Sequence, residues 1–197
     1  MQLLTMSKKA RYNTLKELIY WSYSNLAMAH SAVVKKQDNY SSFNFMIRSR
    51  LYKGLNTGTM NIRSFFDDEK IKLQSGNFCN YCGSNNSLAL DHILPKKYIL
   101  TDNAENLIFA CKSCNSSKGK KDLMEWMAHN NSFLPLMIIR RYLKLVYFYS
   151  FYNNLLEITL SQLESMTVPF NYKYIPIDFP QPSNLKLNIT DELPNNS

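Results

Sequence analysis

Two Cys-x-x-Cys pairs constrain this chain more than any other feature of its sequence. The pairs, Cys79/Cys82 and Cys111/Cys114, contain all four cysteines of the 197 residues and are separated by 28 residues. Two such turns can bring four thiolates together, and four thiolates complete the tetrahedral coordination of Zn²⁺. The sequence therefore predicts a zinc site that joins the two ends of the intervening segment.

A site closed by four thiolates has no open position for water or substrate, so the predicted zinc is structural. It would staple a segment that is too small to fold by burial alone, and metal binding would then supply folding free energy. Other interpretations stay open at this point. The cysteines could form disulfides or remain unpaired, although a reducing compartment argues against disulfides, and an iron–sulfur cluster would use the same ligands.

Composition indicates a globular protein with a buried core, since 45% of the residues are apolar and 19% are charged. The sequence does not open on a signal-peptide pattern. The most apolar later stretch, FLPLMIIRRYLKLVYFYSFYNNLL, is interrupted by Arg140, Arg141 and Lys144, whose charges are costly in a bilayer. We therefore expect a cytoplasmic protein without a membrane-spanning segment.

The net charge of +8 comes entirely from the first two thirds of the chain. Residues 1–130 carry 18 Lys and Arg against 10 Asp and Glu, whereas residues 131–197 carry 5 of each kind. Positive charge attracts polyanions, nucleic acid first among them. It also keeps a protein soluble, so charge alone leaves both interpretations open.

Most of the chain outside the cysteine segment has helical periodicity. Helices are predicted over residues 7–36, 43–55, 64–76, 120–130 and 133–163, the last with Pro135 near its start. Short apolar runs between turn-rich pieces predict a small hairpin within residues 77–119. From residue 168 onward the proline-rich sequence predicts an extended tail, packed at its aromatic residues and loose at its end.

Polar residues that could take part in catalysis lie between the two cysteine pairs and directly after the second pair. Asp91 and His92 stand side by side at the end of the apolar run LAL, and Asn106 precedes a second run, LIFAC. Asn115 directly follows the last cysteine, and Lys118 comes three residues later. A purely structural zinc loop needs none of these, and the zinc would bring Asn115 near the strand of His92.

This constellation resembles the ββα-metal module of the HNH endonucleases, in the form that has two zinc-binding cysteine pairs. The shared pattern is CxxC, a strand ending in Asp-His-Ile-x-Pro, an Asn-Leu before the second strand, and CxxCNxxK. In this chain it falls on Cys79/Cys82, Asp91 to Pro95, Asn106-Leu107, and Cys111/Cys114 with Asn115 and Lys118. The resemblance implies an α+β fold: a zinc-stapled module (76–128) in a mainly helical chain, with an N-terminal helical extension (1–75) and a C-terminal one (129–197).

The resemblance also implies roles for individual residues. His92 would be the general base that takes a proton from the attacking water. Asp91 and Asn115 would hold one catalytic Mg²⁺ or Mn²⁺ through oxygen atoms, which hard cations prefer. Asn106 would orient the strand of His92. The implied substrate is DNA, cut to 5′-phosphate and 3′-hydroxyl ends.

Each residue also has a structural interpretation. His92 could be a hydrogen-bonded core histidine, Asn115 a helix cap, and Asn106 only a loop cap. The sequence departs from the most literal family pattern because Asn115 stands where many members have His, and because KKYILTDNAE replaces the usual glycines before Asn106. The shape of that loop is therefore not predicted.

Basic residues surround the predicted site and are expected to contact phosphates: Lys96, Lys97, Lys118, Lys120 and Lys121. In the C-terminal extension, the cations and aromatics of IIRRYLKLVYFYSFY favour a core helix over a nucleic-acid or partner surface. The flanks suggest a protein partner, such as the ATPase of an anti-phage or restriction system, or a second copy of the chain. The main alternative function is a non-catalytic zinc module that binds nucleic acid.

Overall fold

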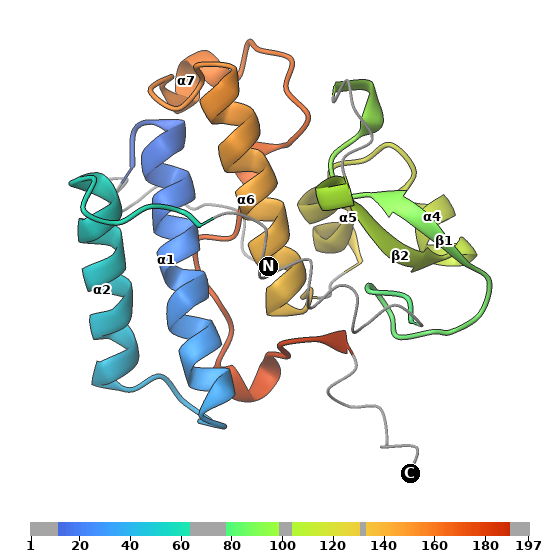
Figure 1. Cartoon of the computed structure of the whole chain (residues 1–197), viewed down its shortest axis with the longest axis horizontal. Coiled ribbons are helices and arrows are strands. Elements are labelled where there is room, and N and C mark those ends of the chain that lie inside the picture. The colour runs from blue at the N-terminus through green and yellow to red at the C-terminus, as the bar shows by residue number, and fades with distance from the viewer. Residues whose placement is uncertain (1–11, 64–77, 99–103, 131–132, 190–197) are drawn as a thin grey trace.

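A computed structural model describes residues 12–63, 78–98, 104–130 and 133–189. A layer of long helices lies beside a smaller unit that contains a two-stranded sheet (Figure 1). The predicted α+β class is therefore confirmed. The helix predicted over residues 64–76 and the end of the tail lie outside the described residues.

Helix α1 (Leu15–Val34) is the centre of the helical layer. Thr14 begins it with a capping box, in which its hydroxyl accepts from the backbone N–H of Glu17 and the Glu17 carboxylate accepts from the backbone of Thr14. Apolar side chains at helical spacing, among them Leu15, Leu18 and Ile19, are fully buried. Both predicted N-terminal helices are thus present, the second as α2 (Ser42–Asn56).

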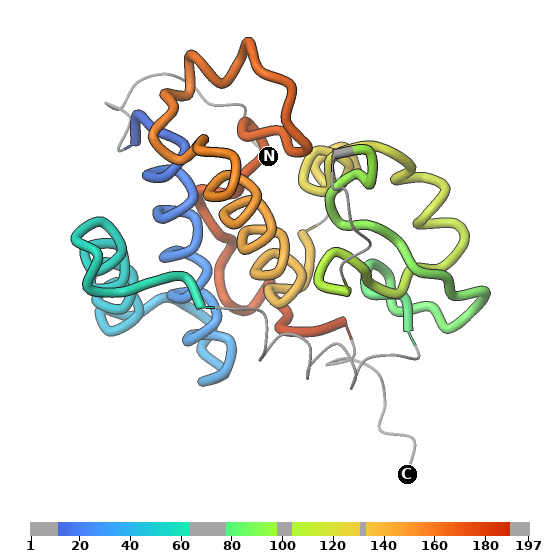
Figure 2. Tube along the Cα trace, turned by 45° about the horizontal axis from the view of Figure 1, so that its top comes forward, coloured from blue at the N-terminus to red at the C-terminus, as the bar shows by residue number. Residues whose placement is uncertain are grey.

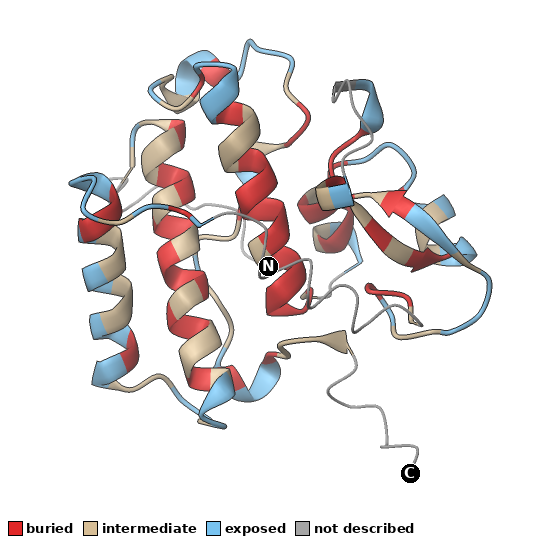
Figure 3. Cartoon of the chain, viewed as in Figure 1, coloured by how far each residue is buried: buried red, intermediate tan, exposed pale blue. Residues whose placement is uncertain are grey.

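Helix α6 (Leu136–Tyr152) packs on the opposite side of α1 from α2, and Pro135 stands at its N-cap. Much of α6 is buried, whereas α2 is exposed along its outer side (Figure 3). Arg141 and Lys144 lie in the interior with exposures of 3% and 0%. The prediction that this stretch forms a helix of the core is therefore confirmed at Arg141 and Lys144.

The C-terminal segment runs alongside α1, between α1 and α6, so the two extensions pack together as one helical body (Figure 2). After the short helix α7 (Leu160–Leu163) it runs through η3 (Tyr172–Tyr174) and η4 (Pro182–Asn184). The indole N–H of Trp21 donates to the carbonyl of Ile177 at 3.1 Å, and the Ser22 hydroxyl donates to that of Pro176 at 2.6 Å. The predicted packing of the tail at its aromatic residues is confirmed at Phe170, which is buried, and the aliphatic side chains of Ile175 and Leu185 are buried as well.

The smaller unit is built on an antiparallel hairpin of β1 (Leu88–His92) and β2 (Leu107–Cys111). Leu88 pairs with Cys111 at one end and His92 pairs with Leu107 at the other. Between the strands lie η1 (Lys96–Tyr98) and η2 (Ala104–Asn106), and after them come α4 (Lys112–Lys118) and α5 (Leu123–His129). The register places the second cysteine pair at one end of the hairpin and His92 at the other.

Buried polar contacts fix this unit to the helical body. The Tyr142 hydroxyl on α6 donates to Asp122 at 2.7 Å, and Asp122 also caps α5 by accepting from the Glu125 N–H at 2.9 Å. Burial raises the pKa of the Asp122 carboxyl, and these hydrogen bonds oppose the rise. Arg141 donates to the carbonyl of Ala104 at 3.0 Å, so α6 also holds the turn that leads to Asn106. No helix in the described ranges is long and apolar enough to span a membrane.

Candidate metal centre and active site

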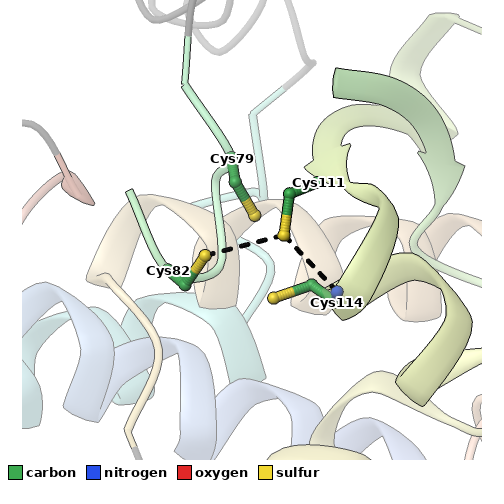
Figure 4. A group of neighbouring side chains, drawn as sticks. All are labelled: Cys79, Cys82, Cys111 and Cys114. Carbon is green, nitrogen blue, oxygen red and sulfur yellow. Dashed lines mark hydrogen bonds between the residues drawn. The ribbon is translucent and has the colours of Figure 1, made fainter. Parts of the chain in front are cut away.

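The four cysteines converge from two elements of the smaller unit. Cys79 and Cys82 lie on a turn before β1, Cys111 ends β2 and caps α4, and Cys114 lies in the first turn of α4 (Figure 4). Their sulfur atoms all lie within 4.8 Å of one another, and the Cys82 and Cys111 Sγ atoms are 3.8 Å apart. A tetrahedron of Zn–S bonds of about 2.3 Å has edges of about 3.8 Å, so the arrangement fits one zinc ion.

All four cysteines are free, and the 3.8 Å between the Cys82 and Cys111 sulfur atoms is much longer than the roughly 2.05 Å of a disulfide bond. The backbone N–H of Cys114 donates to Cys111 Sγ at 3.4 Å and is the main reason that the pKa of Cys111 is lowered to about 7. Burial raises the pKa of Cys82 and of Cys114. A bound cation deprotonates such thiols outright, so zinc would hold all four as thiolates.

Backbone geometry shapes the first cysteine turn. Gly83 has φ +78°, a conformation that L side chains rarely adopt, and its N–H donates to the Cys79 carbonyl at 2.8 Å. The N–H of Asn80 donates to the Phe109 carbonyl at 2.8 Å. The turn is therefore tied to β2, the strand that delivers Cys111.

Asp91 lies in the interior, 5% exposed, and both of its carboxylate oxygens have partners. The Tyr81 hydroxyl donates to Oδ2 at 2.7 Å. The Lys118 ammonium lies 3.3 Å from Oδ1 and 3.2 Å from Oδ2, and it also donates to the His92 carbonyl at 2.6 Å. Asp91 is thus the centre of a buried network that joins the first cysteine turn, β1 and the end of α4.

Lys118 departs from the sequence prediction, which placed it among phosphate-contacting lysines on the surface. Its side chain is 1% exposed, because Lys118 faces β1 from the last turn of α4. Burial lowers the pKa of Lys118, and the charge of Asp91 opposes that change. Its ammonium is committed to Asp91 and His92, so the described geometry does not offer it to an external phosphate.

His92 is the last residue of β1 and is half-buried. Successive side chains of a strand alternate between its faces, so His92 is directed away from the interior that holds Asp91. Asn106 lies just beyond, and its amide makes two bonds to the backbone of Leu94: Oδ1 accepts at 2.8 Å and Nδ2 donates at 2.9 Å. The Asn106 carbonyl also accepts from the Ile93 N–H at 2.9 Å. The chain that follows His92 is therefore fixed in place, which is the geometry that an orienting role requires.

Asn115 lies on α4 three residues before Lys118, and this spacing places both on one face of the helix. Its side chain is half-buried, and among the described residues it has no hydrogen-bond partner. Its amide oxygen is therefore not engaged by the described fold. The helix-capping alternative is not seen, since Cys111 occupies the N-cap of α4.

Comparison with protein families identifies the unit that holds these residues. The family described as HNH endonuclease matches residues 79–121. We refer to the matched residues as the HNH module. Searches of curated proteins and of solved structures gave no significant match.

Two residues near the site were not singled out from the sequence: Tyr81 in the HNH module and Trp126, which follows the module on α5. Tyr81 lies inside the first cysteine pair, where a buried hydroxyl cannot be told from a core aromatic by spacing alone. Trp126 packs edge-on against Tyr81 with ring centroids 5.0 Å apart, and its N–H donates to the Ser117 hydroxyl at 3.0 Å. Burial and the neighbouring Asp91 raise the pKa of Tyr81 well above its ordinary value, so it remains a donor to Asp91.

The remaining predicted lysines lie on the surface of the HNH module. Lys96 and Lys97 are exposed on η1, and Lys120 and Lys121 are exposed directly after α4. Lys121 donates to the Ser117 carbonyl at 3.1 Å. Four of the five predicted cations are therefore exposed on the outside of the module.

Proposed function

We propose that this protein is a metal-dependent endonuclease that hydrolyses phosphodiester bonds in DNA. The observation that carries the proposal is the match of residues 79–121 to the HNH endonucleases. The match spans the four residues to which the resemblance assigns roles: Asp91 and His92 on β1, Asn106 at the end of η2, and Asn115 on α4. A zinc-stapled module that served only as a scaffold could use Asp91 and Asn106 for folding but would have no use for His92 and Asn115 beside them.

Donor chemistry at the site suits a hard divalent cation. An ionised carboxylate offers about four acceptor positions, and Tyr81 and Lys118 occupy most but not all of those on Asp91. Together with the Asn115 amide oxygen, the remaining position could hold Mg²⁺ or Mn²⁺. Such an ion, when bound, stabilises the negative charge that develops on the phosphate and on the leaving oxygen.

The side chains of this chain would supply the proton chemistry and the positioning. His92 would accept the proton of the attacking water at a ring nitrogen. Asn106 would keep the backbone after His92 in one conformation through its two bonds to Leu94. The products expected from this chemistry carry 5′-phosphate and 3′-hydroxyl ends.

Cleavage of plasmid DNA tests this proposal. The zinc-loaded full chain should convert supercoiled plasmid to nicked or linear forms with Mg²⁺ or Mn²⁺, and EDTA added briefly, without loss of zinc, should stop the reaction. The new ends should be substrates for DNA ligase, which requires 5′-phosphate. Metal-independent cleavage, or ends that cannot be ligated, would contradict the proposed chemistry.

The second candidate function is a non-catalytic zinc module that binds nucleic acid. One observation favours it: Asp91 is already paired with Lys118 and Tyr81, a network that could serve folding alone. This function predicts DNA binding without cleavage under any metal condition.

Exposed lysines of the HNH module should contribute affinity without selecting sequence. The double variant Lys120→Ala/Lys121→Ala should weaken DNA binding on all sequences and reduce the slope of log K against log salt by about 0.9 for each lost phosphate contact. Titrations at several salt concentrations measure the slope, with Lys53→Ala, exposed on α2, as the control. An unchanged slope in the double variant together with a reduced slope in the control would place the DNA on the helical body.

The biological setting forms a further part of the proposal. We propose a cytoplasmic location, since paired thiolates persist in a reducing compartment, and a role in anti-phage defence or restriction. A protein partner, such as an ATPase, or a second copy of the chain is supported by large apolar side chains that are exposed on the helical body: Val34, Phe43, Phe45, Met46, Phe151 and Tyr152.

A further inference from the structure

The Asp91 carboxylate carries its own counter-ion. Lys118 contacts both oxygens of Asp91, at 3.3 and 3.2 Å, and the two formal charges cancel. Among the described residues, the cysteine cluster is the one group of three or more Cys, His, Asp or Glu side chains close enough to hold a metal, and Asp91 is not part of it. A divalent cation that approaches Asp91 therefore meets a carboxylate that is already neutralised.

We propose that Lys118 makes divalent-metal binding at Asp91 dependent on nucleic acid. This inference rests on the proposed function and adds a regulation of the same site. Without nucleic acid, repulsion between the Lys118 ammonium and a divalent cation offsets much of the attraction to Asp91. A phosphate of the substrate adds the missing negative charge, so metal and DNA each increase the affinity for the other.

The position of Lys118 prevents it from moving aside easily. Its side chain is buried, and its ammonium also donates to the His92 carbonyl at 2.6 Å. The preceding residue, Ser117, accepts a hydrogen bond from the indole N–H of Trp126 at 3.0 Å. The cation is thus a fixed part of the site, and its charge acts on any ion that Asp91 binds.

The charge of Lys118, more than its bulk, should control metal affinity. Lys118→Met keeps a chain of similar length without charge, and Lys118→Gln keeps a hydrogen-bond donor without charge. Lys112→Met is the matched control, because Lys112 lies on the same helix and is exposed. Asp91→Asn removes the proposed carboxylate ligand, so any Mn²⁺ that this variant binds measures the background binding at other positions.

Mn²⁺ affinity of the zinc-loaded full chain tests the proposal, measured by electron paramagnetic resonance with and without a cleavage-resistant phosphorothioate duplex. We expect the duplex to tighten Mn²⁺ binding to the wild type at least about tenfold. Without DNA, both Lys118 variants should bind Mn²⁺ at least about tenfold more tightly than the wild type, and Lys112→Met should equal the wild type. In the Lys118 variants the duplex should tighten Mn²⁺ binding by a smaller factor than in the wild type.

Equal DNA-free affinities in the wild type and the folded Lys118 variants would overturn the inference. If neither Lys118 variant keeps its zinc and its fold, the test rests on the wild type alone. Equal Mn²⁺ affinities of the wild type with and without DNA would then overturn the inference. If the protein cleaves DNA but the Lys118 variants leave Mn²⁺ affinity unchanged, only the inference is overturned. If Mn²⁺ binding depends on DNA but no cleavage occurs, only the proposed function is overturned. No Mn²⁺ binding in any state contradicts both.

Discussion

Cys79→Ser is expected to abolish zinc binding and to unfold the HNH module. Cys79 is fully buried and supplies one of the four clustered sulfur atoms, and strands of five residues cannot form a stable hairpin by themselves. Structural zinc sites of this kind contribute about 10–16 kcal/mol, which exceeds the stability of most small domains. Elemental analysis and the thermal unfolding transition measure both effects.

Ser113→Ala is the matched control for this prediction. Ser113 is exposed between Cys111 and Cys114 on the same turn but offers no sulfur ligand, so the variant should keep one zinc per chain and the wild-type unfolding transition. The structural role of the metal would be wrong if Cys79→Ser remained folded with its zinc lost, or if it kept full zinc occupancy.

Local sequence patterns predicted the elements of the fold well. Helical periodicity located α1 and α2, and the cysteine spacing located the cluster of four sulfur atoms. Both patterns could be read from the sequence because each reflects short-range geometry, that of a helix turn or of the ligands around one ion. Periodicity could not show that the two extensions pack as one body. That arrangement depends on contacts such as Trp21 to Ile177, which are 156 residues apart in the sequence.

The environment of Asp91 was the main feature that the sequence did not reveal. A lysine in a basic stretch is usually exposed, and Lys118 has exposed cationic neighbours at Lys120 and Lys121. Its burial follows from the tertiary position of α4 against β1, which directs one face of the helix to the carboxylate. Tyr81 was missed for the same reason, since its partner Asp91 lies ten residues away on another element.

His92→Ala is expected to reduce the DNA cleavage rate by roughly 10²–10⁴-fold, the usual contribution of a general base. The fold, the zinc and DNA binding should be retained, because the strand pairing of His92 with Leu107 and the hydrogen bond from Lys118 to the His92 carbonyl do not need the imidazole. Extra metal should not restore the rate. His129→Ala is the matched control, since His129 is exposed on α5 and should be dispensable.

Variants of the proposed metal ligands should behave differently from His92→Ala. Asn115→Ala removes one neutral oxygen ligand, so higher Mg²⁺ or Mn²⁺ concentrations should restore part of its activity. Asp91→Ala removes the charged ligand and leaves the buried Lys118 ammonium without its carboxylate, so it should be the more severe change.

The central claim is that His92 activates the water that cleaves DNA. Single-turnover cleavage of one DNA substrate over a range of Mg²⁺ concentrations, by wild type, His92→Ala and His129→Ala at equal zinc content, tests it most directly. We predict wild-type rates for His129→Ala and, for His92→Ala, a rate at least about 10²-fold lower at every Mg²⁺ concentration. Cleavage by His92→Ala at the wild-type rate, or its recovery at high Mg²⁺, would contradict the claim.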